Sequence, residues 1–353
     1  MLLIFFLVSC SEENQDTTNS ASPTLNQNQS DLAYETIATN LQEPWEIVKQ
    51  GDRIVISERD GHIVEVLNGE TSRSQVMLEK DLSNQSEAGL LGIAFPPNFT
   101  DTAYAYYSYM EEENYYQRVI EIKKSGDFWK ETNVLLDKIP GGQFHQGGRI
   151  EIGPDQALYI TTGDATNPDL SQDISSLAGK ILRMNLDGTI PKDNPFENSY
   201  VYSYGHRNPQ GLAWDTEGNL YATEHGNQAH DEINRIKMGK NYGWPIIEGE
   251  ETGEEMESPI VHSGESTWAP SGLAYLDEKF YFASLRGEGV RVFDPEVSEQ
   301  KLLISNLGRV RDVLATTDGI YVITNNTDGR GNPTEMDDRL IFIPLDQLKE
   351  LSS

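Results

Sequence analysis

The chain has 353 residues, of which 57 are acidic and 27 basic, so its formal net charge is −30. A surface this acidic repels phosphate backbones, which argues against nucleic acid as a partner and favours divalent cations. The chain contains one cysteine, Cys10, which excludes a disulfide framework. Its length suits one large all-β domain or two smaller domains.

The first nine residues, MLLIFFLVS, form a short apolar run that ends before Cys10. The run is too short to span a bilayer and is typical of a secretory signal. With a cysteine directly after it, the segment resembles a bacterial lipoprotein signal, whose cleavage leaves an acylated Cys10. The alternative is a buried strand with an inert thiol. Residues 10–32 are rich in Ser, Asn, Gln and Thr and predict a flexible tether. We therefore expect an exported protein, periplasmic or on the outer membrane, that is held to a membrane only by lipid at Cys10.

From residue 33 onward the sequence predicts a single all-β domain. Turns such as Asp-Gly and Asn-Gly lead into apolar, aromatic-rich strands, and most of these strands end on a polar tip. The repeated runs are 52–70, 102–110, 157–164, 219–226, 279–294 and 319–329. This repetition predicts a six-bladed β-propeller over residues 33–353. Propellers hold ligands at the mouth of the central channel, so the polar tips are where chemistry is expected.

A histidine stands in the glycine-rich turn of residues 141–148, ahead of a strand that ends near Asp164. On such a loop His145 can approach a substrate, and imidazoles exchange protons near neutral pH. Asp164 would hold the ring and stabilise its protonated form. From the residues alone, a loop histidine that bonds only to the backbone is the alternative.

Seven motifs follow one another along nearly the whole chain after residue 40. They are GLLGIAFPPNF (89–99), HQGGRIEIGPD (145–155), GKILRMNLDGTIPKDNPF (179–196), YGHRNPQGLAWD (204–215), EHGNQAHDEINRI (224–236), NYGWP (241–245) and WAPSG (268–272). In this order they resemble the soluble glucose/sorbosone dehydrogenase family, and in length the chain resembles its aldose sugar dehydrogenase branch. The resemblance implies a six-bladed propeller that binds pyrroloquinoline quinone (PQQ) and Ca2+. It also implies oxidation of the C1 hydroxyl of aldose sugars to lactones, with electrons leaving to a separate acceptor, either a quinone or a small redox protein.

The resemblance also implies roles for thirteen residues. His145 is expected to be the general base and Asp164 its orienting partner. The expected cofactor contacts are Glu87, Arg207, Asn208, Thr267, Arg286, Arg309 and Arg311. The main-chain carbonyls of Gly226 and Asn227 are expected to hold the calcium beside the quinone. The Glu232 carboxylate and the Tyr242 main-chain oxygen are expected to bind a second, structural calcium.

The residue types suit these roles on chemical grounds. Guanidinium groups match the carboxylates of a planar tricarboxylate, and carbonyl and carboxylate oxygens are the ligands that calcium prefers. From spacing alone, a surface ion pair is the alternative for each arginine, and a solvated acid is the alternative for Glu232.

Two other functions stay open at this stage. A calcium-dependent propeller lactonase would need a cage of carboxylate and Asn side chains at the channel centre, and it would not need several arginines. A non-catalytic sugar- or ligand-binding propeller would keep the blades without the cofactor. The presence of His145 together with Arg309 and Arg311 favours the dehydrogenase.

Overall fold

Strands make up nearly all the regular structure of the chain. The computed structural model describes residues 33–83, 86–98 and 101–352. Within these ranges the helices are α1 (Asp169–Gln172) and α2 (Leu345–Ser352), and none is long and apolar enough to cross a membrane. The predicted all-β class is therefore confirmed. The predicted signal segment 1–9, Cys10 and the tether 10–32 lie outside the described residues.

Four of the sheets in the described chain contain four antiparallel strands each. The first consists of β10 (Ile150–Ile152), β11 (Ala157–Thr162), β12 (Lys180–Asn185) and β13 (Val201–Tyr204). The second consists of β14 (Pro209–Trp214), β15 (Leu220–Glu224), β16 (Glu232–Ile236) and β17 (Val261–His262). The third consists of β18 (Pro270–Leu276), β19 (Lys279–Ser284), β20 (Gly289–Asp294) and β21 (Glu299–Ile304).

The fourth four-stranded sheet combines both ends of the described chain. Its order is β1 (Glu35–Ala38), β24 (Leu340–Pro344), β23 (Gly319–Thr324) and β22 (Val310–Thr316). Strand β1 pairs with β24, with Thr36 opposite Ile341, and the Ala33 amide donates to Gln347 Oε1 at 3.3 Å. The first strand of the domain thus completes the last sheet.

A fifth sheet has eight strands. It runs through β2 (Pro44–Gln50), β3 (Arg53–Glu58), β4 (His62–Leu67), β5 (Glu70–Met77), β9 (Phe128–Pro140), β8 (Asn114–Ser125), β7 (Thr102–Glu111) and β6 (Leu90–Ala94). The pairing of β5 with β9 is parallel, with Val76 opposite Trp129, whereas the other pairs in this sheet are antiparallel. This parallel contact joins two antiparallel halves of four strands at their outer edges.

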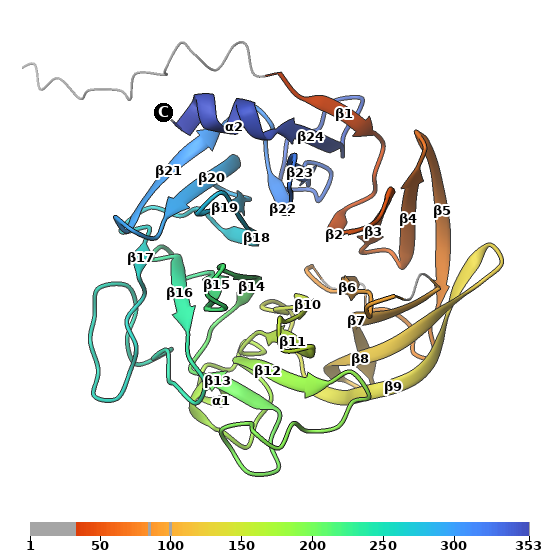
Figure 1. The fold of residues 1–353 in the computed structure, drawn as a ribbon. Helices are drawn as coiled ribbons and strands as arrows, with labels where there is room; N and C mark the ends of the chain where they lie inside the picture. Colours follow the sequence, from red (N-terminus) through yellow and green to blue (C-terminus); the bar gives the residue numbers. More distant parts are fainter. Residues whose placement is uncertain (1–32, 84–85, 99–100, 353) are drawn as a thin grey trace, which may run out of the picture. The chain divides into compact units, whose positions relative to one another are not determined.

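The innermost strands, together with β11, which pairs with β10, contact one another in a closed cycle. Strand β2 lies against β6 and β22, β6 lies against β10, β14 lies against β11 and β18, and β18 lies against β22. Figure 1 shows the sheets of residues 33–352 fanning outward from this ring. The domain is therefore a β-propeller. Close approach around the ring requires glycine at Gly92, because a Cβ there would lie 2.4 Å from the Gly148 carbonyl oxygen.

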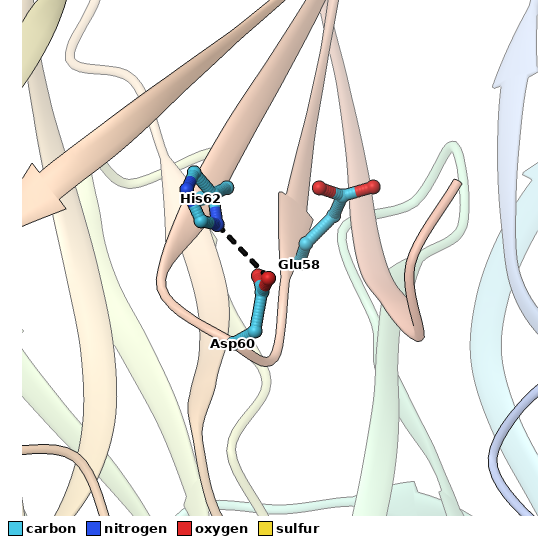
Figure 2. A group of neighbouring side chains, drawn as sticks. All are labelled: Glu58, Asp60 and His62. Atoms are coloured by element: carbon cyan, nitrogen blue, oxygen red, sulfur yellow. Dashed lines mark ion pairs between the residues drawn. The ribbon is translucent and has the colours of Figure 1, made fainter. Parts of the chain in front are cut away.

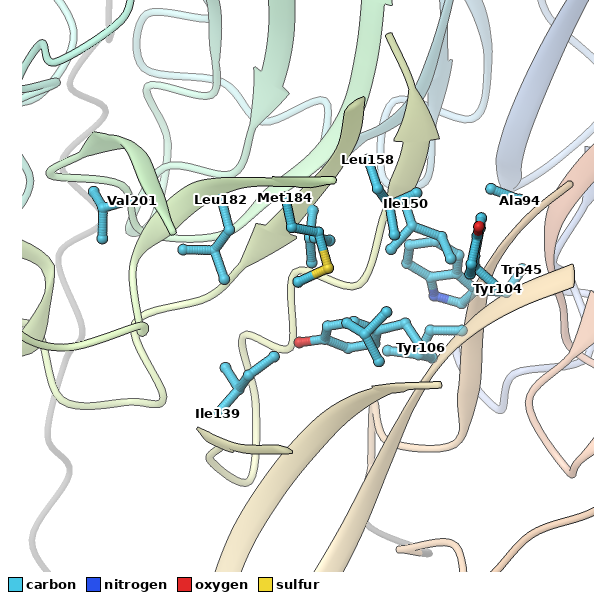
Figure 3. Close-up of a cluster of buried hydrophobic side chains, with 13 residues drawn as sticks. Trp45, Ala94, Tyr104, Tyr106, Ile139, Ile150, Leu158, Leu182, Met184 and Val201 are labelled. Carbon is cyan, nitrogen blue, oxygen red and sulfur yellow. The ribbon is translucent and has the colours of Figure 1, made fainter. Parts of the chain in front are cut away.

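Neighbouring sheets pack through continuous apolar clusters. One cluster fills the space between the strands β6–β9 and β10–β13, and Figure 3 shows Trp45, Tyr106 and Leu158 within it. Burying a large side chain of this kind stabilises the fold by about 1.5–3 kcal/mol. The Tyr106 hydroxyl donates to the Gln146 carbonyl at 2.9 Å, so this core also supports the loop that carries His145.

An ion-pair cluster lies where three of the innermost strands meet. Arg149 NH1 is 3.0 Å from Glu46 Oε1 and 3.2 Å from Asp312 Oδ2, and all three side chains are buried. Glu151 lies on β10 beside this group. Burial raises the pKa of Glu151 to about 7. The attraction of Arg149 opposes this rise, and the repulsion of Asp312 adds to it. One guanidinium thus faces three carboxylates, and burial raises the pKa of Glu46 and of Asp312 as well as that of Glu151.

Candidate active site

Antiparallel pairing explains why residues far apart in the sequence reach one place. In each sheet the innermost strand begins, and the second strand ends, at the same edge. His145 therefore precedes β10 on the side where Asp164 follows β11. Arg207 precedes β14 on the side where Gly226 follows β15, and this arrangement recurs from sheet to sheet.

The loops at this edge surround a cavity of about 230 Å3. Of the thirteen predicted site residues, Asp164, Glu232 and Tyr242 do not line it. The ten that do are Glu87, His145, Arg207, Asn208, Gly226, Asn227, Thr267, Arg286, Arg309 and Arg311. Asp164 lies directly behind His145, whereas Glu232 and Tyr242 line a separate small cavity.

His145 and Asp164 form a hydrogen-bonded pair. His145 Nδ1 is 2.7 Å from Asp164 Oδ1, and the carboxylate is fully buried. Asp164 Oδ1 also accepts from the Thr166 amide at 2.8 Å, and Asp164 Oδ2 accepts from Trp244 Nε1 at 2.9 Å. With Nδ1 engaged, the ring nitrogen left for a proton transfer is Nε2, as in a general base oriented by a carboxylate.

The backbone at His145 is held in an unusual conformation. Its φ is 60°, in the left-handed region that non-glycine residues adopt rarely. The His145 amide donates to Glu87 Oε2 at 3.1 Å, and Glu87 Oε1 lies 3.2 Å from Arg330 NH1. A Cβ at Gly163 would lie 1.8 Å from the His145 carbonyl oxygen, so the loop passes there only because residue 163 is glycine. Both oxygens of Glu87 are thus bonded to the chain itself.

Electrostatics keep Glu87 ionised. Burial alone would raise its pKa, but the attraction of His225 and Arg330 and the bond from the His145 amide outweigh burial and lower the pKa. Glu87 can therefore hold the His145 amide as a charged acceptor, which is the stronger kind of hydrogen bond.

Positive charge exceeds negative charge on the opposite wall of the cavity. Arg309 and Arg311 are buried, and Arg309 pairs with Asp328 at 2.8 Å. Arg311 donates to the neutral Gln210 Oε1 at 2.9 Å. Burial lowers the pKa of Arg311 to about 9, and repulsion from Arg309 adds to this. A bound anion would relieve this repulsion.

Several buried donors on the cavity wall have no hydrogen-bond partner among the described residues. They are Nε of Arg207, Arg309 and Arg311; Nε2 of His225 also has no partner there, and it donates or accepts according to the tautomer of the ring. Buried polar groups are normally paired, so unpaired ones around a single cavity indicate a ligand with several acceptors. Arg309 and Arg311 lie at the start of β22 and Arg207 precedes β14 on another sheet, and their planar guanidinium groups suit several carboxylates of one flat molecule. The residues present therefore fit a cofactor of the PQQ type.

The predicted carbonyl ligands of the first calcium lie on the same wall. The turn at Gly226 is fixed because its amide donates to Asp231 Oδ1 at 3.0 Å. Arg207 makes only long contacts here, 3.3 Å to the His225 carbonyl and 3.5 Å to the Asn227 carbonyl. Asp231 Oδ2 also accepts from the Thr267 hydroxyl at 2.8 Å. Both Asp231 oxygens are therefore bonded within the chain, and the main-chain oxygens are the groups of this turn that suit a hard cation.

Glu232 and Tyr242 line a cavity of about 10 Å3, together with Glu224 and Glu248. Burial raises the pKa of Glu232 to about 8, and repulsion from Glu224 and Glu248 contributes. The Tyr242 hydroxyl donates to the Arg235 carbonyl at 2.6 Å, so the main-chain oxygen is the group of Tyr242 left for a ligand. Three carboxylates around so small a space suit one calcium ion.

A second acidic group has metal-like spacing but lacks the electrostatics of a metal centre. Figure 2 shows Glu58, Asp60 and His62, whose ligand atoms lie within 4.8 Å of one another. Arg73 donates to both oxygens of Glu58, at 2.7 and 2.9 Å, and the Gln42 amide donates at 2.7 Å. The charge of Glu58 is therefore already compensated by Arg73.

Sequence reasoning missed several residues at the cavity. Arg59 follows β3 on one of the predicted polar tips, so its place in the repeat was a usable signal. Arg330 lies in the loop after β23 and bonds Glu87. Phe144 presents an apolar ring beside His145 and is 40% exposed. His225 lines the cavity, and its buried Nε2 has no hydrogen-bond partner among the described residues.

Comparisons with known proteins identify the family of the chain. The Glucose / Sorbosone dehydrogenase family matches residues 41–336. A solved structure of the PQQ-bound form of an aldose sugar dehydrogenase from Streptomyces coelicolor is 37% identical. It covers 88% of this chain and 96% of its own, with a TM-score of 0.81. Aldose sugar dehydrogenase YliI of Escherichia coli (strain K12) is 28% identical over 84% of this chain and 90% of its own. Quinoprotein glucose dehydrogenase B of Acinetobacter calcoaceticus is 36% identical over 60% of this chain and 52% of its own. The chain belongs to the glucose/sorbosone dehydrogenase family.

Proposed function

We propose that the protein is a PQQ- and calcium-dependent aldose sugar dehydrogenase that oxidises the C1 hydroxyl of sugars to lactones. The observation that carries this is that His145, bonded to Asp164 behind it, lines the same cavity as the unpaired donors of Arg207, Arg309 and Arg311. The S. coelicolor relative, whose structure holds PQQ, supports the same chemistry.

In this proposal His145 Nε2 takes the proton from the C1 hydroxyl. The buried charge of Asp164 stabilises the imidazolium that forms, and its bond to Nδ1 keeps Nε2 facing the substrate. Bound PQQ supplies the two-electron acceptor, and bound calcium supplies a Lewis acid beside it. The electrons then leave to a separate acceptor, a quinone or a small redox protein.

The remaining predicted residues hold the cofactor or the loops around it. Arg207, Arg309 and Arg311 are proposed to meet its carboxylates, with Arg286 at the exposed rim. Asn208 Oδ1 accepts from the Gly147 amide at 3.0 Å, so Asn208 also fixes the loop after His145. Thr267, held by Asp231, completes this set of cofactor contacts.

Gly226 and Asn227 are proposed to bind the calcium beside the cofactor, and Glu232 and Tyr242 a structural calcium. Counting the two halves of the eight-stranded sheet as separate blades gives a six-bladed propeller. We also propose export and lipid anchoring at Cys10, as expected from the leader.

The test is a titration of the purified protein with PQQ and Ca2+, followed by dye reduction with glucose. Ligand that binds the native state raises the melting temperature with ligand excess, and dye reduction is expected only after both are added. His145→Gln should retain PQQ-dependent stabilisation and lose dye reduction. Lactone hydrolysis without PQQ would favour the lactonase, and sugar binding without either reaction would favour the binding propeller.

A further inference from the structure

Asp164 owes its orientation to a tryptophan that lies 80 positions away in the chain. Trp244 Nε1 donates to Asp164 Oδ2 at 2.9 Å, while Oδ1 receives His145 Nδ1 at 2.7 Å and the Thr166 amide at 2.8 Å. Asp164 is fully buried, so each of these bonds compensates charge that water cannot reach. The Trp244 bond is the one that holds Oδ2, and it therefore stops the carboxylate from rotating away from His145.

The other side of the same indole lies against a cavity arginine. The Arg207 guanidinium carbon is 5.4 Å from the centroid of the Trp244 ring, within the range of a cation–π contact. The Asp164 amide also donates to the Arg207 carbonyl at 2.8 Å. One side chain thus contacts both the carboxylate that orients His145 and an arginine of the cavity wall.

Trp244 is itself held in place by hydrogen bonds to its main chain. Its amide donates to the Gly205 carbonyl at 2.9 Å, and its carbonyl accepts from Gln172 Nε2 at 2.6 Å. Gln172 also accepts from Asn241 Nδ2 at 2.8 Å. Trp244 lines the small cavity of Glu232 and not the large one, so it reaches the reacting atoms only through its neighbours.

We propose that Trp244 is a positioning residue that couples the orientation of Asp164 to that of Arg207. Its N–H fixes the carboxylate, and hence the His145 tautomer that leaves Nε2 free. Its ring face holds the Arg207 guanidinium toward the cavity. The proposal rests on the dehydrogenase function for its catalytic consequence, but not for its effect on the His145 ring.

The experiment separates the two contacts with two variants. Trp244→Phe keeps an aromatic ring for Arg207 and removes the N–H, whereas Trp244→Leu removes both. The first readout is the pair of 15N chemical shifts of the His145 ring in the ligand-free protein at one pH, assigned by comparison with His145→Gln. Further readouts are the PQQ dissociation constant, kcat and KM.

We expect Trp244→Phe to move the His145 ring from a predominantly Nδ1–H tautomer toward a mixture, as Asp164→Asn should also do. Its kcat should fall about 10- to 100-fold, the usual effect of losing one hydrogen bond to a charged group, with PQQ affinity within about 3-fold of wild type. Trp244→Leu should also weaken PQQ binding about 10-fold. Trp214→Phe is the control, since Trp214 packs 5.1 Å from Tyr159 and does not line the cavity.

If Trp244→Phe leaves both the tautomer and kcat unchanged, the positioning role is wrong. An equal loss of PQQ affinity in the Phe and Leu variants would refute the assignment of separate roles to the N–H and the ring. If Trp244→Phe shifts the His145 tautomer but the wild-type protein oxidises no sugar, the positioning of Asp164 is supported and the dehydrogenase function is refuted. If Trp244→Phe does not fold, incorporation of 3-benzothienylalanine, which has the shape of tryptophan without the N–H, gives the same test.

Discussion

Replacing Glu151 with glutamine should make the protein less sensitive to alkaline pH. Burial raises the pKa of Glu151 to about 7 in the folded protein, against about 4.5 in the unfolded chain. Between these values the folded state keeps a proton that the unfolded state loses, so the free energy of unfolding falls as pH rises. The difference between the two pKa values corresponds to about 3 kcal/mol, fully lost by about pH 8. Glutamine imitates the protonated side chain and removes this loss.

The assay is thermal unfolding of the wild type and Glu151→Gln at pH 5 and pH 8. At pH 5 the two melting temperatures should agree within a degree or two, and at pH 8 the variant should melt several degrees higher. Glu254→Gln, on an exposed loop, controls for the loss of one negative charge from an acidic surface. If the wild type and Glu151→Gln lose the same stability between the two pH values, Glu151 does not carry the excess charge of the Arg149 cluster.

Three further changes probe the cavities. Arg311→Met removes a buried cation that donates to neutral groups, so the ligand-free melting temperature should hold or rise while the PQQ dissociation constant increases about 10- to 100-fold. Gly163→Ala places a Cβ against the His145 carbonyl oxygen and should displace the loop that carries His145. We expect kcat to fall at least about 10-fold while PQQ still raises the melting temperature. An unchanged kcat would show that the loop adapts freely. Glu232→Gln should stabilise the metal-free protein above pH 8, where the wild type has lost the stability that protonation of Glu232 provides. The rise in melting temperature that calcium causes in the wild type should become smaller in this variant, because one of the two proposed calcium sites is lost.

The sequence predicted the fold well because each repeat carries its own local signals. A turn, an apolar strand and a polar tip recur, and antiparallel pairing places every such tip at one edge. That is why His145, Arg207, Arg286 and Arg309, which come from different sheets, line one cavity. Their roles in binding and proton transfer stay predictions until the experiments above are done.

What the sequence did not reveal depends on contacts between distant segments. Glu87 lines the cavity, where a cofactor contact was predicted, but nothing in the sequence indicated that its two oxygens bond the His145 amide and Arg330, which follows Glu87 by more than two hundred positions. Trp244 reaches Asp164 from another sheet. The parallel pairing of β5 with β9 has no local pattern either, because it depends on how two outer edges meet.

The pairing of β1 with β24 sets the order of events during synthesis. Strand β1 is synthesised early, but it cannot pair until its partner β24, residues 340–344, has left the ribosome. Until then β1 and the outer edge of β23 lack the strand that lies between them in the folded sheet. A nascent chain that stalls before β24 therefore presents unpaired strand edges, which is the species that chaperones and proteases would encounter.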